Sequence, residues 1–237
     1  KTSVVAISSW TDYLLYGLLS LVAALFGVAL MRAVAVADRW VAKAAPPRWA
    51  RPGIGGLALA AMALVTPQTL SGGHGALHLD LNGDLPLKMI LILILMKSVA
   101  SIISLSFGFR GGLFFAALFL GALMGQSFSD LVNLVGGEGR LDPIAASLVG
   151  MGALGVAIVG GPFTMSFLVL EATGDFTITA ATLAASLIAS AVVRETFGYS
   201  FSTWHLHLRG ETIRSAHDVS WMRNLTAGKM MRRDVKT

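Results

Sequence analysis

A glycine-rich turn that meets an apolar helix is the part of this 237-residue chain best suited to bind a ligand. Residues Gly108 to Ala116 read Gly-Phe-Arg-Gly-Gly-Leu-Phe-Phe-Ala, and the apolar run continues past Gly121 and Gly125. Glycine lacks a side chain, so its backbone can lie close to a ligand in conformations that other residues avoid. We predict a helix from Leu113, whose first N–H groups have no intrahelical partner and carry the positive end of the helix dipole. Such a helix start can hold an anion.

The same spacing is also typical of a tight turn between two packed helices. In that interpretation Gly121 and Gly125 form a small-xxx-small contact, which lets two helix backbones approach closely. Glycine-rich helix starts are common, so spacing alone leaves both interpretations open.

The composition of the chain is that of a membrane protein. Hydrophobic residues make up 55% of the sequence and charged residues 13%, with a mean hydropathy of +0.72. Soluble domains carry about 25% charged residues. Cysteine is absent, which excludes disulfides and thiolate metal sites. The formal net charge is +5, but the basic residues lie beside apolar spans as topology signals do, so we expect a lipid bilayer and no nucleic acid as partner.

The first half of the chain predicts two long spans. Asp12 to about Val36 is long enough to cross a bilayer with some tilt, and Leu85 to Phe107 is the second span. Between them, a shorter apolar segment from Gly53 to Pro67 is expected to cross back outward, to a loop over residues 68–84 without Lys or Arg. One short basic connection follows the first span and is cytoplasmic by the positive-inside rule; its basic residues are Arg32, Arg39, Lys43, Arg48 and Arg51.

Polar residues in this half have two interpretations each. Lys97 interrupts the second span, where burial is costly, and lies either near an interface or near an ion path. His74 and His78 are spaced i, i+4, but the glycines around them oppose a helix that would present both on one face, so we expect ordinary loop histidines. The serines after the lysine are either helix-packing groups or ligands near the turn; they are Ser98, Ser101, Ser104 and Ser106.

From Pro143 onward the chain has short apolar segments with a break between them. Ile144–Val159 is apolar, Gly160-Gly161-Pro162 interrupts it, and Phe163–Leu170 resumes. Proline fits the first turn of a restarted helix, where its missing N–H is no loss. We predict a discontinuous helix pair, with which transporters aim helix ends at a site near the membrane midplane.

The rest of the chain carries packing and boundary signals. Thr177 to Val193 is rich in small residues, which suits close helix packing, including packing between subunits. Glu171 and Asp175 are expected to mark a membrane boundary. After Gly198 the composition turns polar, and the basic residues near the end predict a cytoplasmic C-terminus.

Three ordered motifs resemble those of the CLC chloride channels and exchangers. Residues 112–116, Gly-Leu-Phe-Phe-Ala, are similar to the Gly-x-Phe-x-Pro signature of that family. Residues 161–164, Gly-Pro-Phe-Thr, followed by Leu-Val-Leu-Glu at 168–171, resemble its Ala-Pro-Leu-Thr segment. Ser71-Gly72-Gly73 resembles its upstream Ser-Gly-Gly turn, and residues 226–231 look like the start of a cytoplasmic CBS domain. The match covers residues 10–210 in order.

The resemblance implies an all-α membrane protein with a CLC-type bundle of tilted and discontinuous helices, one half of an inverted repeat. Residues 1–210 would be the C-terminal half of the transmembrane region, and residues 211–237 a cytoplasmic linker with the start of a truncated CBS domain. The missing N-terminal half would supply a Gly-Ser-Gly-x-Pro serine and a gating glutamate, motifs that this sequence lacks.

The implied function is chloride transport by a channel or a chloride/proton exchanger, in a homodimer in a bacterial inner membrane. The anion would be bound by helix N-termini and backbone amides without covalent chemistry, so we expect neither an enzyme nor a cofactor other than the transported chloride. A pore-inactive membrane sensor or scaffold of the same fold, and a transporter of fluoride or nitrate, stay open as alternatives.

The resemblance also implies the chloride ligands. In the family, the backbone amides of the two residues after the signature glycine bind chloride; here the glycine is Gly112 and the two residues are Leu113 and Phe114. No metal is expected. The signature proline is replaced by Ala116, which leaves the helix start less rigidly preset.

The resemblance places the inner tyrosine of the family near Ser202, in Phe201-Ser202-Thr203. The serine has a hydroxyl, but its side chain is too short to reach as far as a phenol. Tyr199 lies one turn away and is the alternative inner ligand.

Overall fold

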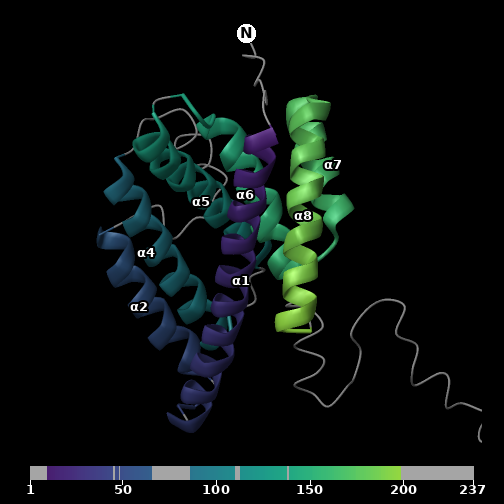
Figure 1. Cartoon of the computed structure of the whole chain (residues 1–237). Helices are drawn as coiled ribbons and strands as arrows, with labels where there is room; N and C mark the ends of the chain where they lie inside the picture. The colour runs from purple at the N-terminus through teal and green to yellow at the C-terminus, as the bar shows by residue number, and fades with distance from the viewer. Residues whose placement is uncertain are drawn as a thin grey trace, which may run out of the picture.

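Every regular element in the part of the chain that the structure describes is an α-helix. The structure, a computed structural model, describes residues 10–44, 46–47, 49–65, 86–109, 113–137 and 139–198. Four of its helices, α1, α4, α5 and α8, are long and apolar enough to cross a membrane, so the prediction of an all-α membrane protein is confirmed. The helices are α1 (Trp10–Ala44), α2 (Arg51–Val65), α4 (Leu87–Ser106), α5 (Leu113–Gly136), α6 (Pro143–Val159), α7 (Pro162–Thr173) and α8 (Phe176–Thr196) (Figure 1).

Several residues named above lie outside the described ranges, so their predictions stay predictions. They include the loop motif at residues 71–73, the stretch that resembles a CBS domain, and the following single residues: His74, His78, Gly112, Tyr199 and Ser202.

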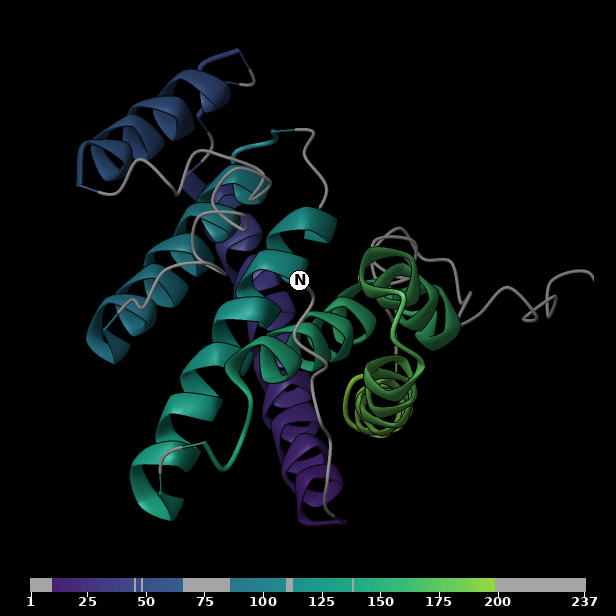
Figure 2. The same cartoon turned by 90° about the horizontal axis from the view of Figure 1, so that it is seen from above.

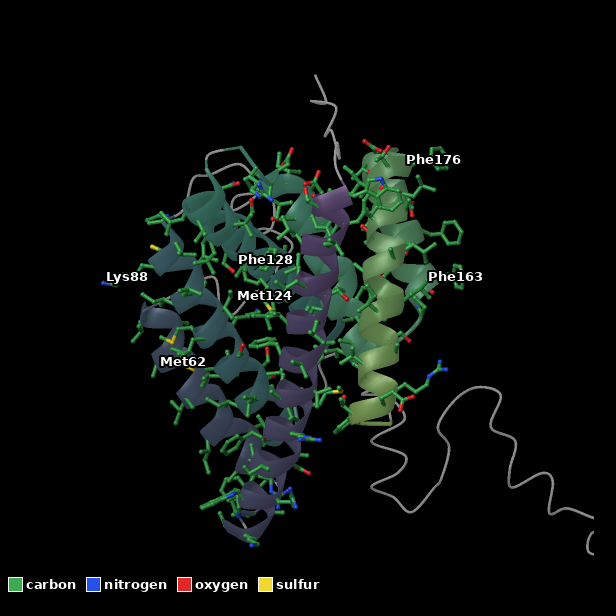
Figure 3. The ribbon with its side chains drawn as sticks, viewed as in Figure 1. Met62, Lys88, Met124, Phe128, Phe163 and Phe176 are labelled. Carbon is green, nitrogen blue, oxygen red and sulfur yellow. The ribbon has the colours of Figure 1, made fainter. Side chains whose placement is uncertain are left out.

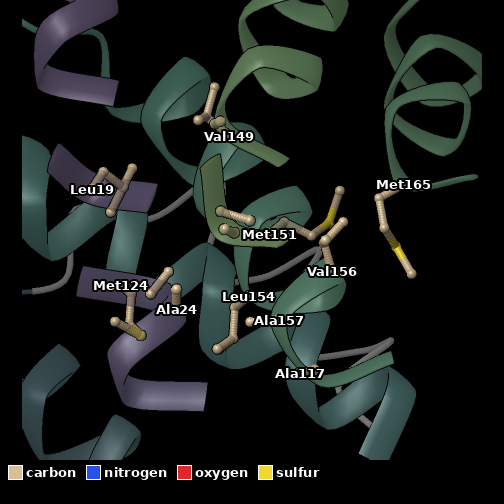
Figure 4. Close-up of a cluster of buried hydrophobic side chains, with 14 of the residues drawn as sticks. Leu19, Ala24, Ala117, Met124, Val149, Met151, Leu154, Val156, Ala157 and Met165 are labelled. Carbon is tan, nitrogen blue, oxygen red and sulfur yellow. The ribbon is translucent and has the colours of Figure 1, made fainter. Parts of the chain in front are cut away.

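Helix α6 lies at the centre of the bundle. It packs against α5, α1, α8 and α7, while α4 packs against α1 and α5 (Figures 1 and 2). Its Ala153, Leu154 and Ala157 side chains are fully buried in the main apolar core. Figure 4 shows this core, in which methionines and small aliphatic side chains from several helices meet.

Helix α1 is longer than the sequence pattern predicts. It continues to Ala44, so Arg32, Arg39 and Lys43 lie on a helix and the prediction of a connection that begins at Arg32 is wrong. No helix breaker occurs before the prolines at positions 46 and 47, and alanine, lysine and arginine favour a helix even where the apolar pattern has ended.

Helix α2 does not support the predicted outward crossing. Its 15 residues cover about 22 Å, less than the hydrocarbon core of roughly 30 Å, and it is shorter than the helices that can span. It lies at the edge of the bundle beside α4 (Figure 2). The contact is close, because a Cβ on Gly55 would lie 2.6 Å from the Cβ of Phe107.

The predicted discontinuous helix pair is confirmed. Helix α6 ends at Val159 and α7 begins at Pro162, with Gly160 and Gly161 between them at φ angles of 87° and 74°. Residues with side chains rarely adopt such angles, so the two glycines permit the break.

Aspartates fix the starts of α6 and α8. Asp142 Oδ1 accepts from the N–H groups of Ile144 at 2.7 Å and Ala145 at 3.3 Å. Asp175 Oδ1 accepts from those of Thr177 at 2.7 Å and Ile178 at 3.3 Å. Each carboxylate therefore satisfies helix N–H groups that have no intrahelical partner. The predicted boundary residue Asp175 is thus an N-cap.

Helix α8 packs closely within the bundle, as its small residues predict. Its Ala185 and Ala189 are buried, and Ser20 Oγ of α1 donates to the Ala185 carbonyl at 2.6 Å. The opposite side is apolar and exposed: Phe163 of α7 and Phe176 of α8, 60% and 77% exposed, project away from the bundle (Figure 3). Such a side suits lipid or a further apolar protein surface.

Candidate functional site

The glycines of α5 form a seam with α6. A Cβ on Gly121 would lie 2.5 Å from the carbonyl oxygen of Gly150, and a Cβ on Gly125 would lie 2.5 Å from the carbonyl carbon of Ala146. Gly150 is restricted in the same way by the Gly121 carbonyl. The two backbones are in direct contact, so the small-xxx-small interpretation of Gly121 and Gly125 is confirmed.

The seam places the start of α5 beside the α6–α7 break. Gly121 lies opposite Gly150 and Gly125 opposite Ala146, so the two helices are antiparallel. The same register, continued toward the start of α5, brings Leu113 level with the end of α6. The N-terminal end of α5 and the interrupted backbone at Gly160 thus share one level of the bundle.

A second contact supports this register. A Cβ on Gly155 of α6 would lie 3.0 Å from Met165 Sδ of α7 and 3.1 Å from Leu118 Cδ2 of α5. Gly155 thus lies beside the second turn of α5 and the first turn of α7. Three helix termini converge here, those of α5, α6 and α7.

The predicted ligand residues lie in the first turn of α5. Leu113 is 2% exposed, Phe114 is half-buried and Phe115 is 45% exposed. The rings of Phe114 and Phe115 meet edge to face with centroids 5.0 Å apart. Ala116, at the position of the family's proline, is buried as part of a regular helix. Helix geometry gives this turn N–H groups that α5 itself cannot satisfy.

Lys97 of α4 is a buried cation beside α5. It is 5% exposed, and its Nζ lies 5.9 Å from the centroid of the Phe119 ring, a cation–π distance. Phe119 is about 9 Å along α5 from Leu113. Lys97 of α4 is therefore buried against α5, which opposes the interpretation of a residue that extends to an interface.

The serines of α4 behave as packing groups. Ser98, Ser101 and Ser106 donate to the carbonyls of Ile94, Lys97 and Ile102, at 2.6, 2.8 and 2.7 Å. An anion needs donors, and each hydroxyl has only one proton, which its own helix already takes. The geometry thus opposes the ligand interpretation for these three residues.

A polar clamp that the sequence interpretation missed closes the connection between α5 and α6. Asn133 Nδ2 donates to the Leu141 carbonyl at 3.0 Å, and Asn133 Oδ1 accepts from the Leu141 N–H at 2.9 Å. Ser129 Oγ donates to the same carbonyl at 2.8 Å. A single asparagine in an apolar helix is the signal that could have located it, because polar groups inside membrane helices find partners.

The described residues hold no group of three or more acidic or histidine side chains that could bind a metal. What they offer instead is a helix start beside a broken helix within a bundle of candidate spans. These features are typical of membrane transport proteins in which interrupted helices aim their ends at a site near the membrane midplane.

The sequence comparison is specific. Residues 2–194 match the sequence profile of the voltage gated chloride channel family. The chain therefore belongs to this family, and the resemblance to the CLC proteins is confirmed.

Curated relatives include H(+)/Cl(−) exchange transporters ClcA from Salmonella arizonae and Salmonella paratyphi B. Each is 30% identical over 123 residues, which is 52% of this chain and 26% of the relative. The match thus spans about a quarter of the length of these relatives.

The crystal structure of a slow cyanobacterial Cl−/H+ antiporter has the same fold. It superposes with a TM-score of 0.76 at 19% identity, and the match covers 88% of this chain and 51% of the antiporter chain. The chain spans about half of that structure.

Proposed function

We propose that the chain is the second membrane half of a CLC-type protein that transports chloride. The observation that carries the proposal is the convergence of the α5 start with the α6–α7 break. Helix α5 supplies N–H groups that have no partner within the helix and a positive dipole end, and the break supplies irregular backbone at the same level. This arrangement suits a partly dehydrated anion.

In this proposal the backbone amides of Leu113 and Phe114 donate to chloride, and Gly112 lets the backbone approach it. Lys97 adds a positive charge nearby without contacting the ion. The protein forms no covalent bond with the anion, so transport depends on binding that is strong enough to admit the ion and weak enough to release it.

The proposal includes a first half that contributes donors from the opposite side. Its support is that the match covers 51% of the antiporter chain, and that two opposed helix sets can replace more of a hydration shell than one. It also includes a homodimer in a bacterial inner membrane, a cytoplasmic C-terminus, and, over residues 211–237, a cytoplasmic linker with the start of a CBS domain.

The first prediction tests the amide ligands with two neighbouring substitutions in the full-length protein. Gly112→Val should weaken chloride binding tenfold or more, because loss of a hydrogen bond to a charged group costs about 1.5–3 kcal/mol. Leu113→Val keeps the backbone amide and should change binding less than about threefold. Calorimetric chloride titration measures both. Equal losses would point to packing and overturn the amide site.

A further inference from the structure

A basic pocket lies where α8 ends against the second half of α1. Its volume is about 360 Å³, at the small end of the ligand-pocket range of roughly 300–1,000 Å³. Helix α1 continues beyond the end of α8 (Figure 1), so α1 extends past the pocket whereas α8 ends at it. Its lining residues are Arg32, Ala35, Val36, Arg39, Thr196 and Phe197.

The two arginines of the pocket are exposed and held by backbone carbonyls. Arg32 Nη2 donates to the Thr196 carbonyl at 3.5 Å, and Arg39 Nε donates to the Ala35 carbonyl at 3.2 Å. A guanidinium has five N–H donors, so each keeps others for a ligand. Among the described residues neither arginine meets a carboxylate, and Asp38 does not line the pocket.

The position of the pocket along α1 corresponds to a membrane surface. Trp10 at the start of the helix is 89% exposed, as in the aromatic belt at a membrane interface. The distance from Trp10 to Arg32 along the helix is about 33 Å, close to the hydrocarbon thickness of roughly 30 Å. With Trp10 at one boundary of the hydrocarbon core, Arg32 would lie at the opposite boundary and Arg39 about 10 Å beyond it, in the headgroup region.

We propose that this pocket binds the phosphate of an anionic phospholipid headgroup. A guanidinium matches phosphate geometry with paired N–H groups, and two of them seven residues apart lie on one side of α1. Val36 and Phe197 give the pocket apolar walls beside the arginines, which suits the glycerol and upper acyl chains. Basic pockets between membrane helices are a known form of lipid recognition. The site is independent of which ion the protein carries.

The test uses full-length protein in neutral detergent and a water-soluble, short-chain phosphatidylglycerol, titrated calorimetrically. Arg32→Gln with Arg39→Gln should weaken binding roughly thirtyfold, the scale of two cationic contacts with an anionic lipid. Lys43→Gln with Arg194→Gln removes the same charge from exposed positions outside the pocket and should change binding less than twofold. Equal weakening in the two double variants would mean general surface charge and overturn the proposal.

A third variant keeps both charges and fills the pocket. Ala35→Phe should reduce lipid binding about as much as the arginine pair, and unchanged binding would exclude the pocket as the site. Inorganic phosphate and glycerol phosphate are titrated in parallel and should not saturate the site at millimolar concentration. If either competes as well as the lipid, the pocket takes a soluble anion and the lipid assignment is wrong. A monodisperse elution profile and an unchanged unfolding temperature confirm that each variant is folded.

Discussion

Helix α5 meets its surroundings in two different ways along its length. Around Gly121 and Gly125 its backbone touches that of α6 directly, with no room for a side chain on either glycine. At its start, Leu113 is buried but Phe115 is 45% exposed, and the first N–H groups have no partner within the helix. The first region is closed by protein, whereas the second is the proposed chloride site.

The comparison shows that glycines in one short stretch serve different purposes. Gly121 and Gly125 are required because a side chain would strike another backbone. Gly112 precedes the helix, and its proposed purpose is to let an anion approach. The two roles differ in what a substitution should change: folding at the seam, and anion affinity at the helix start.

The largest expected effect is therefore at the seam. Gly125→Ala places a Cβ against the backbone of Ala146 and should cost about 3 kcal/mol, the upper end of the usual cost of overpacking. Gly17→Ala is the matched control, because its Cβ would lie an ordinary 3.6 Å from Ile188 Cδ1. Thermal unfolding of the full-length protein in detergent measures both. Similar unfolding temperatures for the two variants would show that α5 and α6 can move apart at little cost, and would contradict the prediction.

A smaller effect is expected from the buried cation near the helix start. Lys97→Met should weaken chloride binding about tenfold, because a unit charge about 10 Å away contributes roughly 1.7 kcal/mol at an effective dielectric constant of 20. Lys97→Arg should retain most of the affinity. The exposed Lys88 of α4 is the control, and Lys88→Met should leave the affinity within twofold. If it lowers affinity as Lys97→Met does, the effect is not local to the helix start.

The smallest effect should come from the serines of α4. Ser101 Oγ donates its only proton to the Lys97 carbonyl at 2.8 Å, so Ser101→Ala should change chloride affinity less than twofold. Chloride titration of this variant tests whether the start of α5 binds chloride without a hydrogen bond from the Ser101 hydroxyl. A tenfold loss would make the serine a ligand and move the site toward α4.

Local chemistry explains which parts of the fold were predictable. The Gly-Gly-Pro run at 160–162 breaks a helix wherever it occurs, and the structure has the break there. The long spans follow from hydropathy. By contrast, the end of α1 was placed too early because the apolar pattern stops before the helix does, and only the prolines at 46 and 47 end it.

The site was less predictable because it depends on contacts between helices. The sequence indicates that Gly121 and Gly125 favour a close contact, but nothing in their spacing names Ala146 and Gly150 as partners. Likewise, the depth of Lys97 could be read from its position in α4, whereas the Phe119 ring beside it could not. Which residues pack against each other from different helices is decided by the tertiary fold, and the residue spacing within one helix does not predict it.

The broken helix also has a consequence for how the protein enters the bilayer. Helices α6 and α7 are about 25 Å and 18 Å long, so neither reaches across the hydrocarbon core of roughly 30 Å by itself. The backbone between them cannot be left in contact with lipid tails, which offer no hydrogen bonds. The pair therefore cannot be inserted as an independent span, as α4 or α8 can. Helix α5, made just before it and tied to it by the Asn133 clamp, gives the nascent pair a protein surface on which to enter the membrane.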